Sequence, residues 1–282
     1  MTEQGRIKSL NNKPARKGRY VLYWMQAAQR AKYNHALEAA VTRANQLKLP
    51  LVAVFGITDS YPEANLRHYH FMLEGLKDAK KVLAKRSIQL VVRHQSPEKA
   101  AIELSEKAVR VVVDAGHTRI ERKWRRQAAK NIKCSLEEVE TNLIVPVSEV
   151  TDKENFSAGT LRPRINKRLA EYLVKIRQGR PLYSSLDMKF NSFDINDIES
   201  ALSKLNIDRS VGVVKGFKGG TGEAKKKLRD FIKNKLGRYA ELRNDPCIDG
   251  TSNMSPYLHL SLIHISEPTR PLYISYAVFC LK

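Results

Sequence analysis

The sequence predicts an α/β fold: a doubly wound, parallel, five-stranded sheet, followed by a connector and a further segment with helical patterns. Between residues 15 and 150, short runs of β-branched and aromatic residues alternate with segments of helical periodicity. Parallel strands need a crossover connection of about a dozen residues, and these helical segments supply it. After Val150 the alternation stops, and only helical patterns and turns follow.

Five apolar runs predict the strands of the sheet, at residues 20–24, 51–57, 88–92, 110–114 and around 137–145. Four segments with apolar residues at three- and four-residue spacing predict the helices between them, at 34–47, 63–85, 97–107 and 120–133. The third helix has a clear start, because Ser96 suits an N-cap and Pro97 the first helical position. Ligands of such sheets bind beyond the carboxyl ends of the strands. The candidate binding loops are therefore residues 24–29, 58–64 and 114–119.

Residues 151–215 are predicted to form a connector, which includes a basic amphipathic helix at 161–178. The glycine-rich sequence GFKGGTGEAKKKL then leads into a helix predicted at 223–236, with Thr221 as its N-cap. A phosphate-binding P-loop would end in Gly-Lys-Ser/Thr, whereas here Gly222 is followed by Glu223. We therefore expect no nucleoside triphosphate site at this turn.

Charge is the strongest compositional signal in this chain of 282 residues, whose formal net charge is +21. Residues 1–19, 119–133, 161–180 and 213–238 carry +5, +6, +6 and +7. Any one of these stretches fits an ordinary solvated surface, but together they favour a polyanionic partner such as nucleic acid.

The sequence also excludes several classes of protein. Its apolar runs are far shorter than the roughly 20 residues that span a bilayer, and the N-terminus lacks a signal peptide. We therefore expect a soluble, cytoplasmic protein without membrane contact. The cysteines, Cys134, Cys247 and Cys280, are isolated, which argues against a disulfide framework and a zinc site.

Five segments, in order and at consistent spacing, resemble the class II cyclobutane pyrimidine dimer DNA photolyases of the photolyase/cryptochrome family. They are YVLYWMQAAQRAKYNHAL (20–37), PEANLRHYHFMLEGL (62–76), VVVDAGHTRIERKWR (111–125), SAGTLRPRINKRL (157–169) and GRYAELRNDPCIDGTSNMSPYLH (237–259). The resemblance covers roughly residues 20–260 and depends on the combination of motifs. It implies that residues 15–150 form the antenna-type domain of this family and residues 216–260 the start of its helical FAD-binding domain.

The resemblance further implies a carbon–carbon lyase, a deoxyribodipyrimidine photo-lyase. Such an enzyme binds damaged duplex DNA, flips out the pyrimidine dimer and splits it by electron transfer from light-excited, reduced FAD. The resemblance also implies the possibility of an antenna chromophore of unknown identity in the N-terminal domain. We expect a monomer, and no catalytic residue or metal ligand is assigned.

Residue by residue, the flavin contacts of the family correspond to Tyr239, Thr251, Ser252, Asn253, Met254 and Ser255. Family positions near the bound lesion correspond to Arg243 and Asn244, which suit phosphates and base edges as DNA-binding residues. Without the resemblance, the same residues fit an ordinary capped helix start, a surface arginine and a turn asparagine.

The resemblance stops at His259, and residues 261–282 have the features of a non-native tail, such as a translated sequencing adapter. The other interpretation is a divergent C-terminus that forms a strand. We expect the chain to be a fragment with little or no repair activity, because FAD in half a pocket would remain largely solvated.

Two other functions fit parts of the sequence. A cryptochrome-type flavin photoreceptor would share the flavin contacts but not the repair of dimers. A non-enzymatic nucleic-acid-binding α/β module would need only the basic stretches. Flavin absorption would distinguish the photolyase and the photoreceptor, which both bind flavin, from the nucleic-acid-binding module. Light-driven repair of dimers would distinguish the photolyase from the photoreceptor.

Overall fold

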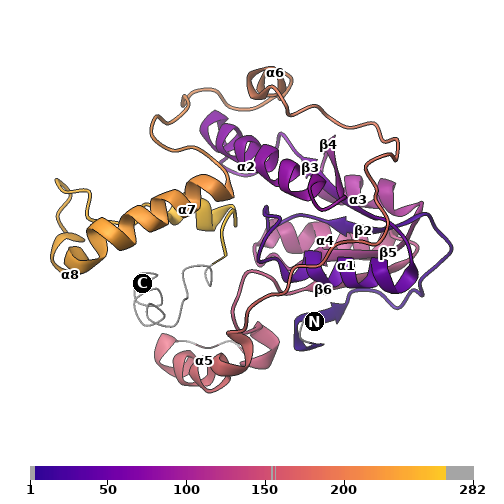
Figure 1. Cartoon of the computed structure of the whole chain (residues 1–282), viewed down its shortest axis with the longest axis horizontal. Coiled ribbons are helices and arrows are strands. Elements are labelled where there is room, and N and C mark those ends of the chain that lie inside the picture. The colour runs from indigo at the N-terminus through magenta and orange to yellow at the C-terminus, as the bar shows by residue number, and fades with distance from the viewer. Residues whose placement is uncertain (1–3, 154, 156, 265–282) are drawn as a thin grey trace.

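A six-stranded sheet forms the centre of the computed structural model, which describes residues 4–153, 155 and 157–264 (Figure 1). The strand order is β1-β6-β5-β2-β3-β4. All five predicted parallel strands are confirmed, as β2 (Tyr20–Trp24), β3 (Leu51–Ile57), β4 (Gln89–His94), β5 (Ala108–Asp114) and β6 (Ser135–Val139). The sixth strand, β1 (Ile7–Ser9), was not predicted, and it pairs antiparallel with β6.

The chain leaves the middle of the sheet in both directions, as a doubly wound fold requires. From β2 it proceeds through β3 to β4 on one side, and it then returns to the other side of β2 as β5 and β6. Tyr23 is therefore paired with Ala53 on one side and with Val112 on the other. The switch point between β2 and β5 is where ligands of such sheets usually bind.

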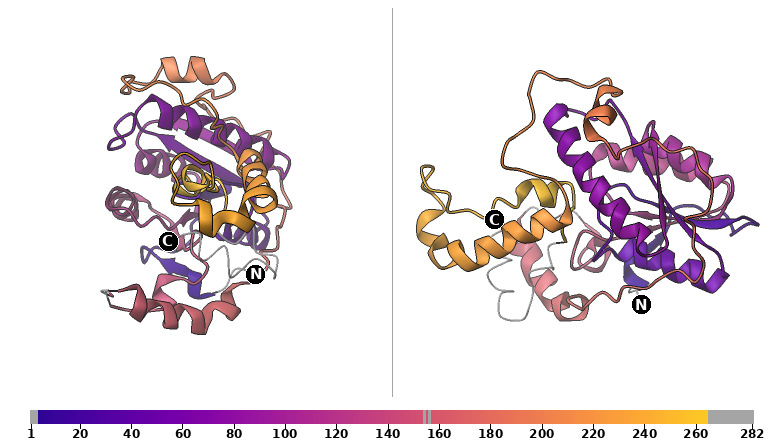
Figure 2. Two further views of the ribbon diagram at one scale, coloured as in Figure 1. Left: turned by 90° about the vertical axis from the view of Figure 1, so that its left-hand side faces the viewer. Right: turned by 45° about the horizontal axis from the view of Figure 1, so that its top comes forward.

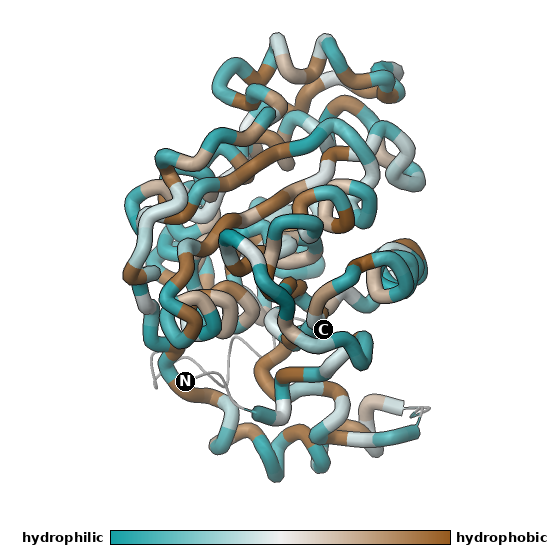
Figure 3. The backbone as a smooth tube through the Cα atoms, turned by 90° about the vertical axis from the view of Figure 1, so that its right-hand side faces the viewer, coloured by the Kyte–Doolittle hydropathy of each residue, from teal (hydrophilic) through white to brown (hydrophobic). Residues whose placement is uncertain are grey.

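Two helices cover each face of the sheet. Helices α1 (His35–Leu47) and α2 (Leu66–Ala84) pack on the face that includes Tyr23, and α3 (Pro97–Ser105) and α4 (Arg119–Asn131) pack on the face that includes Trp24. Successive side chains of β2 alternate between these two buried clusters, as the period of a strand requires. Figure 3 shows the resulting hydrophobic strands among more hydrophilic helices.

Local caps explain where these helices begin. The Asn34 side chain accepts a hydrogen bond from the Leu37 amide at the start of α1. Thr118 and Glu121 form a reciprocal capping box at the start of α4, and Ser96 and Pro97 begin α3 as predicted.

The connector covers the exposed edge of the sheet at β4. The Phe193 amide donates to the Val92 carbonyl over 2.8 Å, and the Val92 amide donates to Ser192 Oγ over 3.0 Å. Farther along the strand, the Gln89 amide donates to Ser185 Oγ over 2.8 Å. An uncovered edge strand invites pairing with other chains, and the connector prevents it here. Its helices are α5 (Ala158–Tyr172) and α6 (Ile198–Ser203).

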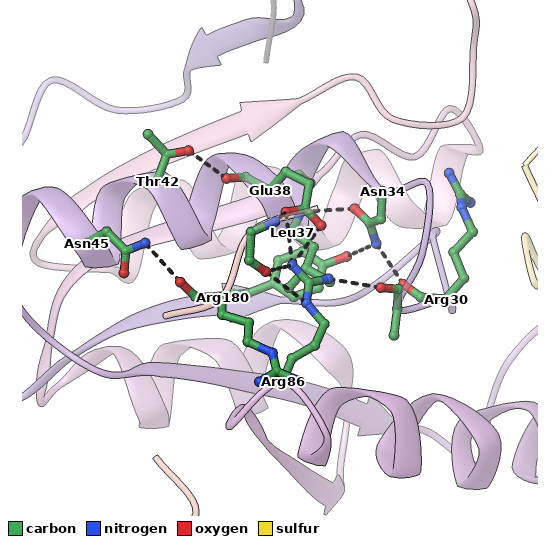
Figure 4. Close-up of polar contacts among 12 residues, drawn as sticks. Arg30, Asn34, Leu37, Glu38, Thr42, Asn45, Arg86 and Arg180 are labelled. Atoms are coloured by element: carbon green, nitrogen blue, oxygen red, sulfur yellow. Dashed lines mark hydrogen bonds and ion pairs between the residues drawn. The ribbon is translucent and has the colours of Figure 1, made fainter. Parts of the chain in front are cut away.

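A buried ion pair fastens the connector to the sheet domain (Figure 4). Glu38 of α1 and Arg86 lie 2.8 Å apart, and both are at least nine-tenths buried. The Gly179 amide donates to Glu38, and Arg86 donates to the Gly179 carbonyl. The same side chains that neutralise each other therefore also bind the connector backbone.

A smaller helical unit follows the connector. It consists of α7 (Thr221–Asp230), a π-helical turn (Phe231–Lys235), a 3₁₀ turn (Leu236–Arg238), α8 (Tyr239–Leu242) and α9 (Ser255–His259). The predicted helix at 223–236 is thus present but changes its winding after Asp230. In Figures 1 and 2 this unit projects away from the sheet domain, beyond one end of α2.

Side chains of α2 accept hydrogen bonds from backbone amides at the start of α7. The N-cap of α7 is not Thr221, contrary to our expectation from the sequence. Gly220 occupies the cap position with a φ of 113°. The amides of Gly219 and Thr221 donate to the carboxylates of Glu74 and Asp78 over 2.6 and 2.9 Å. These carboxylates stand where a bound phosphate would have to sit, which agrees with the absence of a P-loop pattern.

The boundaries proposed for the domains, including the tail at 261–282, stay predictions. Residues 261–264 are buried in the structure, and Leu262 packs against Gly75 of α2. Residues 265–282 lie outside the described part of the chain.

Candidate functional site

Tyr239, the first predicted flavin contact, opens α8 and is half-buried. Its ring meets Phe231 edge-on, at 5.6 Å between centroids and an angle of 88°. The guanidinium of Arg243 lies 5.2 Å from the centre of the Tyr239 ring. The phenol is thus held between an apolar ring and a cation, an arrangement that fixes its orientation.

The predicted DNA-binding residues lie directly beside this tyrosine. Arg243 follows the last residue of α8, and its amide donates to the Tyr239 carbonyl over 3.0 Å. Arg243 and Asn244 are both exposed. The structure therefore places the predicted lesion contacts directly after α8, the short helix that begins at one predicted flavin contact.

The loop before α9 carries the other predicted flavin contacts and is held by polar contacts of its own. Lys235 Nζ lies 2.6 Å from Asp249 Oδ2, and Asn253 Nδ2 donates to Asp249 Oδ1 over 2.8 Å. These hydrogen bonds lower the pKa of Asp249 below its usual value, so the carboxylate stays ionised. Asn253 itself adopts the left-handed conformation, with a φ of 55°.

Close packing places this loop next to α8. Gly250 is buried against Leu242, and a Cβ atom at Gly250 would lie 2.8 Å from the Leu242 Cβ and 3.0 Å from its carbonyl oxygen. Only glycine permits this approach without a shift of the backbone. The segment that begins at Thr251 is therefore adjacent to the helix that begins at Tyr239.

The five loop residues offer different groups to a ligand. Thr251 and Ser255 are exposed and Ser252 is half-buried, so their hydroxyls are accessible. The Met254 side chain is buried in the cluster with Phe71 and Tyr257, so it leaves only backbone groups for contact with a ligand. The structure shows that Met254 anchors α9 to α2.

A second polar site lies at the switch point of the sheet, between β2 and β5. The buried Asp114 carboxylate accepts hydrogen bonds from the amides of Gln26 and Ala27 and from the Tyr23 hydroxyl, at 3.1, 2.6 and 2.8 Å. Burial raises the pKa of Asp114 above its usual value, and these donors oppose that shift. Asp114 thereby fixes the loop after β2, one of the predicted binding loops.

Two glutamines in this loop have unsatisfied amide groups. Gln26 and Gln29 are each only 7% exposed. Both side-chain polar atoms of Gln26, and the Oε1 of Gln29, make no hydrogen bond to any described residue. Buried amides rarely lack partners, so these atoms indicate a place for a polar ligand or water. The sequence signal was the pair of glutamines in MQAAQ directly after a strand, which we did not single out.

None of the helices in the described part of the chain is long and apolar enough to cross a membrane.

Comparisons with known proteins identify the family. Residues 21–182 match the family described as DNA photolyase. The chain is 40% identical over 276 residues to a deoxyribodipyrimidine photo-lyase from Methanothermobacter thermautotrophicus, an alignment that covers 98% of this chain and 60% of that protein. It is 28% identical to a deoxyribodipyrimidine photo-lyase from Potorous tridactylus, covering 87% of this chain and 46% of that protein.

Solved structures show the same fold. An archaeal photolyase from Sulfolobus tokodaii, crystallised with two FAD molecules, superposes with a TM-score of 0.66 at 17% identity, covering 92% of this chain and 57% of that one. A cryptochrome from Synechocystis superposes with a TM-score of 0.69 at 17% identity, covering 89% and 54%. The chain thus spans 60% or less of the length of these proteins. The match over residues 21–182, which is more than half of the sequence, shows that the chain belongs to the DNA photolyase family.

Proposed function

We propose that this chain acts in the light-driven repair of cyclobutane pyrimidine dimers in DNA, as a class II photolyase. The observation that carries the proposal is the 40% identity to the archaeal deoxyribodipyrimidine photo-lyase, which extends over nearly the whole chain. The five class II motifs quoted above support the finer assignment. A cryptochrome has the same fold at 17% identity, and such a likeness says nothing about function.

The cofactor of this proposal is FAD, which supplies the electron that splits the dimer. The residues present fit one side of such a ligand. The accessible hydroxyls of Thr251, Ser252 and Ser255 can donate to a pyrophosphate, and the fixed ring of Tyr239 offers an aromatic edge. Lys235 is committed to Asp249, so it orders the loop and leaves phosphate binding to the hydroxyls.

The proposed substrate is damaged duplex DNA, contacted by Arg243 and Asn244. Both side chains are exposed, and Arg243 lies beside Tyr239, so they can reach a phosphate and a base edge while the flavin contacts lie on the same unit. We expect the protein to work as a cytoplasmic monomer with no membrane partner.

The switch point of the sheet is the proposed place of an antenna chromophore. The unsatisfied amides of Gln26 and Gln29 fit a planar ligand that carries both hydrogen-bond donors and acceptors. The carbonyl and amide of one glutamine side chain can pair with complementary groups on a heterocycle. The identity of this chromophore stays open.

Titration of the purified chain with FAD tests the cofactor assignment. We expect the double variant Thr251→Val/Ser252→Ala to bind FAD about a hundredfold more weakly, because it loses two hydrogen bonds to a charged group and each contributes roughly 1.5 kcal/mol. Ser203→Ala, a loss of one exposed hydroxyl on α6, serves as the matched control. Equal FAD affinity in all three proteins would contradict the assignment of this loop.

Binding to DNA with and without a pyrimidine dimer tests the substrate assignment. Arg243→Ala should reduce the preference for dimer-containing duplex, because the lost contact lies beside the proposed flavin. Unchanged discrimination in Arg243→Ala and in Asn244→Ala would count against these residues. Absence of discrimination in a chimera of this chain with the C-terminal part of the Methanothermobacter photo-lyase would count against the function.

A further inference from the structure

Helix α4 presents a continuous row of positive charges on its outer face. The row follows helical spacing of three and four residues, so its members lie on one side of the helix. All of them are exposed, and we call them the α4 basic stripe: Arg119, Arg122, Lys123, Arg126, Lys130 and, two residues beyond the helix end, Lys133.

Nearby carboxylates do not neutralise this stripe. Glu121 caps the helix with Thr118, while Glu138 pairs with the buried Arg125 and Glu140 with His117. Among the residues that the structure describes, none of the six stripe cations has a carboxylate within ion-pair distance. Six like charges on one face repel one another, a cost that a polyanion would remove.

The rest of α4 limits what this partner can be. Its apolar residues Trp124 and Ala128 are buried against the sheet with Ile132, so the helix has no apolar face left for a membrane. The exposed face holds no large apolar or aromatic residue that could form the core of a protein interface. A regular row of cations without an apolar centre fits the phosphate backbone of a nucleic acid.

The N-terminal segment extends the basic surface at the end of α4. Lys13 Nζ donates to the carbonyls of Lys130 and Ile132 over 3.2 and 2.5 Å. The exposed Lys17 and Arg19 precede β2 at the amino-terminal end of the central strands, where the Arg19 amide donates to the Lys107 carbonyl over 2.8 Å. The positive surface therefore continues past the end of the helix.

We propose that the α4 basic stripe is a second contact surface for the backbone of duplex DNA. At 1.5 Å per residue, Arg119 to Lys130 spans about 16 Å. Phosphates follow one another every 3.4 Å along the axis of each strand, so the stripe faces roughly five phosphates of one strand. In Figure 1, α4 lies within the sheet domain, whereas α8, which Arg243 follows in the chain, is at the far end of the helical unit.

Salt-dependent binding of undamaged duplex DNA tests this surface. The triple variant Arg122→Gln/Arg126→Gln/Lys130→Gln keeps good helix formers at exposed positions, so α4 should remain folded. Binding of a fluorescent 20-base-pair duplex is measured from low to moderate salt in the dark. We expect the slope of log K against log salt to fall by about 2.7, since each phosphate contact contributes roughly 0.9.

A charge-matched control separates a local surface from the overall charge. Lys81→Gln/Lys85→Gln/Lys204→Gln removes three exposed cations from the α2 and α6 side of the sheet, opposite to α4. We expect its slope to change by less than 1, because charges beyond about 10 Å are screened at 0.1 M salt. Equal losses in both triple variants, or no loss in the α4 variant, would overturn the proposal.

One further outcome is informative. Tighter binding of polyglutamate than of duplex DNA to the stripe would favour an acidic protein and overturn the assignment of DNA. The inference extends the proposed DNA-repair function, but the assay uses neither flavin nor a lesion nor light. Failure of FAD binding or of dimer recognition would therefore leave its result unaffected.

Discussion

At the residue scale, the buried charges of this protein bind backbone groups that belong to distant segments. Glu38 and Arg86 join α1 to the connector through Gly179, and Asp114 joins β5 to the loop after β2. The sequence shows an aspartate at the end of RVVVD, but it does not show which amides donate hydrogen bonds to that aspartate. Pattern reasoning finds a buried strand and its polar end, whereas the partners depend on how the chain closes in three dimensions.

The Glu38–Arg86 pair should be important for stability. In Arg86→Met, Glu38 stays buried without its cation, so we expect a loss of about 3–5 kcal/mol in the free energy of unfolding, measured by urea denaturation. Burial already raises the pKa of Glu38, and the variant should therefore regain stability as the pH falls and Glu38 is protonated. Glu38→Leu/Arg86→Met should recover most of the loss.

The exposed pair Arg238–Glu241 provides the control for this prediction. Both side chains are 71% exposed, so Arg238→Gln should change the free energy of unfolding very little. A loss in Arg86→Met no larger than that in Arg238→Gln would show that the buried pair does not hold the connector.

His117 predicts a pH-dependent contribution to stability. Its Nε2 lies 2.7 Å from Glu140, and this hydrogen bond raises the pKa of His117 above the usual 6.5. The stabilisation is therefore complete below pH 6.5 and disappears as the pH rises through the pKa of the folded protein. The stability difference between the parent chain and His117→Asn should shrink over that range in urea denaturation at several pH values. A difference that grows with pH would contradict this sign.

At the element scale, α7 depends on α2 for its first turn. The sequence predicted a flexible glycine turn with Thr221 as cap, and it could not reveal that Glu74 and Asp78, more than 140 positions earlier, accept the hydrogen bonds of this turn. The short β1 was missed for a similar reason, because three residues without apolar alternation form a strand only when β6 is beside them. Local patterns predict elements that have their own periodicity, and long-range partners determine the rest.

Gly219 should be essential for this junction. A Cβ atom there would lie 2.1 Å from the Phe71 carbonyl oxygen of α2, so Gly219→Ala must push α7 away from the sheet domain. We expect faster proteolysis around residues 211–216 while the sheet domain keeps its unfolding midpoint. Gly222→Ala is the matched control, since nothing lies within 4 Å of its Cβ position. This control should be neutral or stabilising by about 0.5–1 kcal/mol. Equal proteolysis of both variants would contradict the packing.

At the scale of the whole molecule, the candidate sites lie on the sheet domain and on the helical unit. The sequence alone predicted the first of these better than the second. The five parallel strands of the sheet domain were predicted, because buried parallel strands and amphipathic helices have strong and distinct periods, whereas the short antiparallel β1 was missed. For the flavin and DNA residues, the resemblance named the positions, and the structure adds that Gly250 and Leu242 bring Thr251 beside the helix of Tyr239 and Arg243. The unsatisfied glutamines at the switch point became visible only once their burial was known.

Light-dependent repair by a chimera tests the proposed function most directly. Residues 1–260 of this chain are joined to the part of the Methanothermobacter protein that follows the position aligned with residue 260, since the chain spans 60% of that protein. Dimers are then counted in ultraviolet-damaged DNA after incubation with FAD in near-ultraviolet or blue light and in the dark. A photolyase predicts loss of dimers in the light only, and a reduced loss in Arg243→Ala. A chimera that folds and binds FAD but leaves the number of dimers unchanged in the light would contradict the proposed function.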